Sequence, residues 1–357
     1  MKKYSIIFLS ILSAMAVIGT AAQGQAPAPA QTQHWSFVAR LNPGLDAIVP
    51  EEAKVEKLAD GFGFLEGPVW VRRGGYLLFS DIPANVIYKW NPADNKVSIF
   101  LKYSGFTGAD DSGAGMQLNN GRALVTLLGS NGVTVDPQGR IVYCAHGDHQ
   151  VVRLEADGKR TVLASEFEGK RLNSPNDLVF KSNGSLYFTD PPAGFRNGVD
   201  DPKKELPFTG LYLLKDGKLQ LLSKELRPNG VVLSPDEKYL YVTDSTLAGN
   251  MKTLVRFELQ PDDTIANGQL FIDMTPDKAP GGPDGIKVDQ RGNVYSTGPG
   301  GVWIISPDGK HLGTILNSEQ PANLAFGGPD GKTLYLTART GLYRIRLNTP
   351  GAQYPGT

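Results

Sequence analysis

Six positions along the chain carry a side-chain oxygen at the start of a similar local motif. Each is followed by an apolar run, and in four of the six the next residue is glycine. The six residues are Glu66, Asn131, Asn176, Asn229, Asp284 and Asn323. Carboxylate and amide oxygens are hard ligands, which suit Ca²⁺ first and Mg²⁺ or Mn²⁺ next. The pattern therefore predicts a cation site, provided that the fold brings these residues together.

Glu66 gives the clearest sign that these residues do more than form turns. It lies in the apolar stretch FGFLEGPVW, residues 62–70, where an unpaired buried charge would be costly. Asn or Asp before glycine is also common in turns, where its side chain bonds local backbone. Six such residues in phase, with a glutamate among them, favour a shared site in which a cation neutralises Glu66.

The motif belongs to a longer repeat that predicts the fold. Each copy reads as a β-hairpin, as in EGPVWVRRGGYLLFSD and NGVVLSPDEKYLYVTD, and successive copies start 39 to 65 residues apart. This spacing is typical of four-stranded blades, so we predict an all-β, six-bladed β-propeller with a central metal site, in preference to a two-layer sandwich. The first strand of each blade would line the channel. Either residues 53–58 or residues 343–347 would close the ring.

The N-terminus predicts export. Lys2 and Lys3 precede a short apolar run, and Thr20-Ala21-Ala22 fits a cleavage site, so residues 1–22 read as a signal peptide. The run is short for a membrane anchor. Residues 23–39 read as a flexible linker and residues 40–350 as the propeller domain, secreted into the periplasm without a membrane span after cleavage.

Composition gives little support to nucleic-acid binding or to a zinc site. Lys+Arg and Asp+Glu both number 36, which gives no electrostatic argument for a nucleic-acid partner. One cysteine, Cys144, and four histidines make a thiolate or poly-histidine zinc site a poor prediction. Cys144 lies in the strand-like run RIVYCAH and reads as a buried apolar residue.

Over about residues 50–347 the chain resembles the gluconolactonase/regucalcin family of calcium-dependent six-bladed hydrolases. The stretches FLEGPVW, GKRLNSPNDLVFKSNGSLYFTDPP and PDGIKVDQRGNVY carry the resemblance, and RLNSPND with FTDPP is most similar to its bacterial gluconolactonase branch. The resemblance implies Glu66, Asn176, Asn229 and Asp284 as metal ligands. It also implies Asp284 as the acid/base residue.

The implied activity is the opening of a sugar lactone, such as glucono-1,5-lactone, to the aldonic acid with Ca²⁺ bound. The alternatives are a phosphotriesterase-like hydrolase and a non-catalytic binding propeller with structural calcium. The sequence leaves open whether Mg²⁺, Mn²⁺ or Zn²⁺ replaces Ca²⁺, whether water or a carboxylate attacks, and the oligomeric state.

Other residues are candidates for secondary roles. Asn131, Asn323, Arg171 and His146 are predicted to bind substrate, with a structural role as the alternative for each. The aspartates that end the second strands, Asp81, Asp190 and Asp244, are expected to bind the backbone of a neighbouring blade. The insert at residues 101–125 is expected to form either a lid over the channel or a surface loop.

Overall fold

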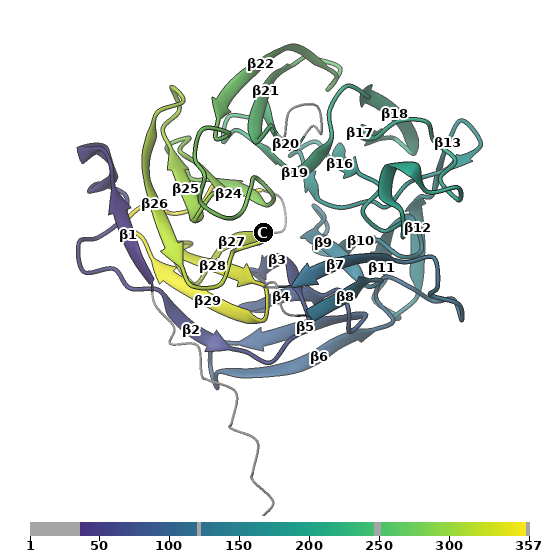
Figure 1. The fold of residues 1–357 in the computed structure, drawn as a ribbon, viewed down its shortest axis with the longest axis horizontal. Helices are drawn as coiled ribbons and strands as arrows, with labels where there is room; N and C mark the ends of the chain where they lie inside the picture. Colours follow the sequence, from purple (N-terminus) through teal and green to yellow (C-terminus); the bar gives the residue numbers. More distant parts are fainter. Residues whose placement is uncertain (1–35, 120–122, 246–250, 355–357) are drawn as a thin grey trace, which may run out of the picture. The chain divides into compact units, whose positions relative to one another are not determined.

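Six antiparallel sheets are arranged around a central axis, as predicted (Figure 1). The computed structural model describes residues 36–119, 123–245 and 251–354. The predicted signal peptide and residues 23–35 of the predicted linker lie outside the described residues. The described part of the chain contains no α-helix, and therefore no helix long and apolar enough to cross a membrane.

The first four blades each use four strands that follow one another in sequence. Blade 1 is β3 (Leu65–Val71), β4 (Tyr76–Asp81), β5 (Val86–Asn91) and β6 (Lys96–Lys102). Blade 2 is β9 (Ser130–Val135), β10 (Ile141–Ala145), β11 (Gln150–Leu154) and β12 (Arg160–Ala164). Blade 3 is β15 (Leu178–Phe180), β16 (Leu186–Asp190), β17 (Gly210–Lys215) and β18 (Lys218–Ser223). Blade 4 is β19 (Pro228–Leu233), β20 (Tyr239–Asp244), β21 (Thr253–Leu259) and β22 (Ile265–Asp273).

The last two blades are completed by strands from the N-terminal end of the described chain. Blade 5 is β23 (Ile286–Val288), β24 (Val294–Gly298), β25 (Gly301–Ile305) and β26 (His311–Asn317), and β1 (Ser36–Arg40) adds a fifth strand beside β26. Blade 6 is β27 (Asn323–Gly327), β28 (Thr333–Ala338) and β29 (Gly341–Arg346), and β2 (Glu56–Ala59) supplies its outer strand. The ring is thus closed by an early segment that pairs with the end of the repeat. The predicted linker, residues 23–39, overlaps β1, so its residues 36–39 belong to a strand instead of a linker.

Apolar side chains between neighbouring sheets hold the blades together. Trp70 of β3 stacks on Tyr335 of β28, with ring centroids 5.6 Å apart, and both side chains are buried. Aromatic pairs of this kind contribute beyond the area that they bury. Cys144 is fully buried in the core of blades 2 and 3, as the sequence predicted.

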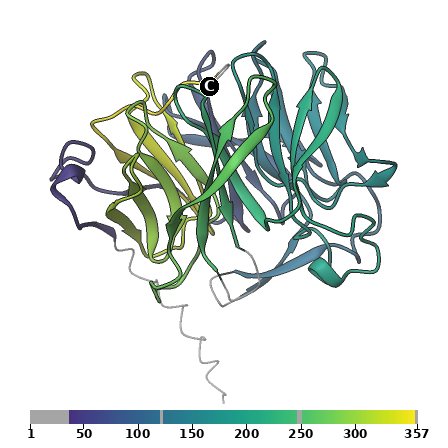
Figure 2. The same cartoon turned by 90° about the horizontal axis from the view of Figure 1, so that it is seen from above.

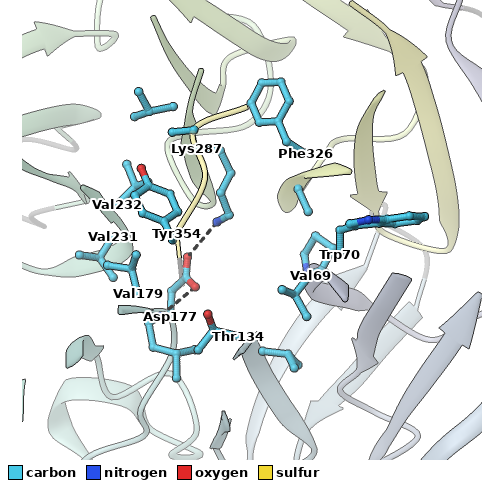
Figure 3. A pocket seen from close by; sticks show the side chains of 16 residues that line it. Val69, Trp70, Thr134, Asp177, Val179, Val231, Val232, Lys287, Phe326 and Tyr354 are labelled. Atoms are coloured by element: carbon cyan, nitrogen blue, oxygen red, sulfur yellow. Dashed lines mark hydrogen bonds and ion pairs between the residues drawn. The ribbon is translucent and has the colours of Figure 1, made fainter. Parts of the chain in front are cut away.

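The C-terminal segment crosses one end of the axial channel. The Ala352 N–H donates to Val288 O over 2.9 Å, and the Tyr354 hydroxyl donates to Leu233 O. Both residues line a channel of about 60 Å³, in which Asp177 and Lys287 form an ion pair of 4.0 Å (Figure 3). The described C-terminal segment, up to Tyr354, therefore lies at the centre of the ring, on the face opposite the insert hairpin described next (Figures 1 and 2).

The insert between blades 1 and 2 forms a hairpin of β7 (Gly115–Asn119) and β8 (Ala123–Leu127). At its base the Gly115 N–H donates to Gly194 O of blade 3 over 2.7 Å. Near its far end the Asn119 side chain donates to Gly63 O, just before β3. The hairpin thus spans from blade 3 to blade 1 across the face where the inner strands begin. The remaining short elements are β13 (Glu166–Phe167), β14 (Lys170–Arg171) and the 3₁₀ turns η1 (Pro43–Leu45) and η2 (Gly198–Asp200).

Candidate active site

The six oxygen-bearing residues lie at the starts of the six inner strands and form a closed ring. Each neighbouring pair of inner strands is in contact around the axis. Backbone bonds link several of the pairs: the Gly132 N–H donates to Asn176 O over 2.7 Å, and the Gly230 N–H donates to Asp284 O over 3.1 Å. Glu66, Asn131, Asn176 and Asn323 are buried, whereas Asn229 and Asp284 are partly exposed. The structure therefore brings together the residues that the repeat aligned.

Two glycines that follow ring residues permit this close approach. Gly67 has a φ of +49°, and a Cβ placed on it would lie 2.0 Å from Asn131 O. A Cβ on Gly230 would lie 2.2 Å from Asp284 O. Any side chain at either position would push neighbouring blades apart. The repeated glycine is thus a packing requirement of the ring.

The aspartates at the ends of the second strands fix the loops that lead into the ring. The Asp190 carboxylate accepts hydrogen bonds from the Asn173 and Ser174 N–H groups over 2.8 and 2.7 Å. Asp81 accepts two such bonds from residues 63 and 64, and Asp244 accepts one from residue 227. These aspartates do bind backbone, as expected, but in the loop that enters their own blade rather than in a neighbouring blade.

The two ring carboxylates, Glu66 and Asp284, are electrostatically coupled. Burial and the nearby charge of Asp284 raise the pKa of Glu66 well above its usual range. Burial, opposed by the charge of Arg339, raises the pKa of Asp284 to about 7. Two carboxyl groups so placed resist joint ionisation unless a cation lies between them. The ring therefore has the electrostatic character of a cation site.

Unpaired amide oxygens complete the donor set. Asn131 Oδ1 and Asn229 Oδ1 are buried and accept no hydrogen bond from the described residues, although such groups are normally satisfied. Asn229 directs its amide nitrogen to the Asp284 carboxylate, so its oxygen is left free. No cluster of three or more His, Cys, Asp or Glu that could hold a metal occurs in the described residues. Two carboxylates with free amide oxygens fit a hard cation such as Ca²⁺ better than Zn²⁺, which favours nitrogen and sulfur.

Comparison with known proteins agrees with this architecture. Residues 64–340 match the model of the SMP-30/Gluconolactonase/LRE-like region. The chain belongs to this family. It is 37% identical to a gluconolactonase of Zymomonas mobilis over 322 residues, which cover 88% of this chain and 87% of that protein. A lactonase of Staphylococcus epidermidis is 29% identical, with 79% of this chain and 75% of that protein covered. The solved structure of a gluconolactonase from Xanthomonas campestris superposes with a TM-score of 0.72 at 30% identity, covering 87% of this chain and 94% of that one.

In this member of the SMP-30/gluconolactonase family, His146 lies against the wall of the ring. Its side chain is buried, and its Nδ1 lies 3.2 Å from Pro175 O, beside Asn176. Burial lowers the pKa of His146 to about 4, so the imidazole is neutral at physiological pH. Its Nε2 has no hydrogen-bond partner among residues 36–119, 123–245 and 251–354. Substrate binding by His146 stays a prediction.

Arg171 lies outside the ring. Its guanidinium donates to Lys203 O over 2.8 Å and lies 3.7 Å from the Glu205 carboxylate. It lines a side pocket of about 260 Å³ together with His149 and Phe195. The structure thus gives Arg171 protein partners of its own, and its predicted contact with substrate would have to be made in this side pocket.

Sequence reasoning missed Arg339, in the turn between β28 and β29. Its guanidinium lies over the Phe64 ring, 4.9 Å from the centroid, and its charge opposes the rise in the pKa of Asp284. Its Nη1 is buried and has no hydrogen-bond partner in the part of the chain that the structure describes. The repeated motif does not include this turn, so it could not predict a role for Arg339. A usable signal was an arginine in a two-residue turn, where glycine or asparagine is usual.

The hairpin β7–β8 covers the same region. Leu127 and Val125 of β8 pack with Phe64, the residue on which Arg339 lies. The insert was expected to form either a lid over the channel or a surface loop, and this contact favours the lid. The site is therefore framed by the ring, the Arg339 turn and the hairpin.

Proposed function

We propose that this protein is a cation-dependent hydrolase that opens a sugar lactone, such as glucono-1,5-lactone, to the aldonic acid. The observation that carries the proposal is the pair of coupled carboxylates, Glu66 and Asp284, in a ring with unpaired amide oxygens. The similarity to a gluconolactonase and a lactonase supports the class of substrate. We infer Ca²⁺ as the cation, with Glu66, Asn176, Asn229 and Asp284 as its ligands.

The cation, when bound, supplies Lewis-acid polarisation of the lactone carbonyl. Asp284 serves as the general base, because it is partly exposed and can reach a water molecule, whereas Glu66 is buried and bonded by Gly67 and Asn323. The water oxygen bonds to the carbonyl carbon while Asp284 accepts the water proton. The ring C–O bond then breaks, and the proton passes from Asp284 to the departing ring oxygen. The product is the open-chain hydroxy acid, and Asp284 returns to its ionised state.

The test is hydrolysis of glucono-1,5-lactone by the mature protein, measured as acid release above the spontaneous rate. The assay is run after chelation, after Ca²⁺ is restored, and with Asp284→Asn. We expect turnover that requires the cation and falls at least 100-fold in Asp284→Asn, since general-base catalysis contributes about 10²–10⁴. Turnover that survives chelation would overturn the cation dependence. No turnover of this or other sugar lactones by cation-loaded, folded protein would overturn the lactonase proposal and redirect the search to phosphotriesters.

A further inference from the structure

Arg339 occupies a backbone position that arginine rarely takes. Ala338 pairs with Gly341, so Arg339 is the first residue of a two-residue turn, and its φ is +52°. Positive φ crowds any side chain, and glycine is the usual residue at the first position of such a turn. An arginine kept in this conformation suggests a function for its side chain.

The turn is held firmly from two sides. Arg339 O accepts a hydrogen bond from the Leu65 N–H over 2.8 Å, one residue before Glu66. The N–H and hydroxyl of Thr340 both donate to the Glu319 carboxylate, over 3.0 and 2.7 Å. The guanidinium rests on Phe64, which is itself buried under the hairpin β7–β8. These contacts therefore fix the position of the Arg339 side chain near the ring carboxylates.

The guanidinium nevertheless has unused binding capacity. Arginine stays charged at all physiological pH values and offers five N–H donors. Its Nη1 is buried without an acceptor among the described residues, which is costly for a charged donor. The neighbouring Asp284 senses its charge. An oxygen-bearing ligand at the ring mouth would satisfy this donor.

We propose that Arg339 is a substrate-binding residue, whose free N–H groups donate to an oxygen of the lactone carbonyl group and then to the carboxylate of the acid product. The proposal rests on the lactonase function proposed above. The planar fork of a guanidinium matches the two oxygens of a carboxylate, which a lysine ammonium cannot do. Arg339 thus selects a substrate whose hydrolysis yields a carboxylate at this point.

Arg339→Gly tests the proposal, because glycine relieves the positive φ while removing the donor. We expect its thermal midpoint to equal or exceed that of the wild type, and kcat/KM for glucono-1,5-lactone to fall about 100-fold, as for loss of one oxyanion donor. Millimolar guanidinium should restore part of the rate in this variant and none in the wild type. Gluconate, measured by calorimetry on the calcium-loaded protein, should bind at least tenfold more weakly.

Two further variants make the result decisive. Asp216→Gly makes the same backbone change at an exposed outer turn, where φ is +50°, and should leave rate and gluconate binding unchanged. Arg339→Lys keeps the charge but loses the fork, so gluconate should still bind more weakly than to the wild type.

The outcomes separate the two proposals. Wild-type turnover with unchanged rate and gluconate binding in Arg339→Gly would overturn the role of Arg339 and leave the lactonase standing. If Arg339→Gly does not fold and Arg339→Lys binds gluconate normally, Arg339 is a structural clamp. A wild type without lactone turnover would overturn the lactonase itself. In that case, equal gluconate binding by wild type and Arg339→Gly would overturn the role of Arg339 as well.

Discussion

Asn323 Nδ2 donates a hydrogen bond to Glu66 Oε2 over 3.1 Å, although the two residues are 257 positions apart in sequence. The contact joins the first strand of blade 6 to the first strand of blade 1 at the point where the ring closes. Asn323 Oδ1 is already occupied by the Leu324 N–H, 2.8 Å away. Asn323 is therefore placed to orient Glu66. If Asn323 also binds substrate, as the sequence predicts, it must do so through the same Nδ2.

The first prediction follows from this contact. Asn323→Ala removes the bond that orients Glu66, and we expect Ca²⁺ affinity to fall about 10-fold or more, as for other residues that orient metal ligands. Calorimetric titration of the chelated protein with Ca²⁺ measures the effect. Asn267→Gly is the matched control, because Asn267 makes the same kind of bond to the Glu258 carboxylate, 2.7 Å away, on an exposed strand. Equal affinities in both variants would contradict the role of Asn323.

The second prediction concerns pH. Without a cation, burial raises the pKa of Asp284 to about 7 and that of Glu66 well above its usual range, whereas both titrate near pH 4 in the unfolded chain. The folded state therefore binds these protons more tightly. Raising the pH from about 4 through about 7 should lower the free energy of unfolding through this pair. With Ca²⁺ bound this loss should disappear above about pH 5, because the pair is then ionised in both the folded and the unfolded state.

Urea unfolding between pH 5 and 8, with chelator and with saturating Ca²⁺, measures these slopes. The double variant Glu66→Gln, Asp284→Asn should lose the difference between the two conditions. Parallel curves for the wild type with and without Ca²⁺ would contradict a cation bound by this pair.

The repeat predicted the fold and the ring because both depend on residues that recur. A residue at the start of each inner strand reaches the axis at an equivalent place. The shared position within the repeat was therefore enough to predict that Glu66, Asn131 and Asp284 lie in one ring. The closing strands β1 and β2 lie outside the repeat and have no copy to reveal them. The sequence offered the early segment as one of two candidates for closing the ring. The pairing of β2 with β29 and of β1 with β26 shows which strands close it.

The cover and Arg339 were harder to predict. The insert carries Asn120-Gly121 between alternating runs, a usual hairpin signal, yet no sequence rule says which blade a hairpin will lie against. Arg339 lies in a two-residue turn, whose equivalent in blade 5 has the same length but is Pro299-Gly300. Its proposed role depends on a ligand and not on another residue, and only the structure shows that its buried Nη1 has no acceptor among the described residues.

The third prediction concerns the loop that enters blade 3. Asp190→Ala leaves the N–H groups of Asn173 and Ser174 buried without their acceptor, and we expect a loss of about 3 kcal/mol in the free energy of unfolding. The loop leads to Asn176, so Ca²⁺ affinity should fall as well. Urea denaturation and Ca²⁺ titration give the two numbers. Asp60→Ala is the control, because this aspartate is largely exposed and its ion pair with Lys57 is expected to contribute under about 1 kcal/mol. Similar losses in both variants would refute the role of Asp190.

The fourth prediction concerns the ion pair beneath the ring. Asp177 is buried and its charge raises the pKa values of Glu66 and Asp284, while Lys287 lies 4.0 Å from it inside the channel. Lys287→Met leaves the Asp177 carboxylate without its counter-charge. The free energy of unfolding of the cation-free protein should fall by about 1–3 kcal/mol, because Asp177 is buried while Lys287 is partly exposed. Ca²⁺ affinity should rise several-fold, because the ring then lies in a more negative potential.

The two effects have opposite signs, which distinguishes electrostatic coupling from general loosening of the fold. Urea denaturation in chelator and Ca²⁺ titration of Lys287→Met measure them separately. Lys310→Met is the control, because its ion pair with Asp308 is 2.8 Å long but largely exposed, and it should change neither quantity appreciably. If Lys287→Met binds Ca²⁺ more weakly than the wild type, Lys287 supports the ring by packing, and its charge does not tune the site.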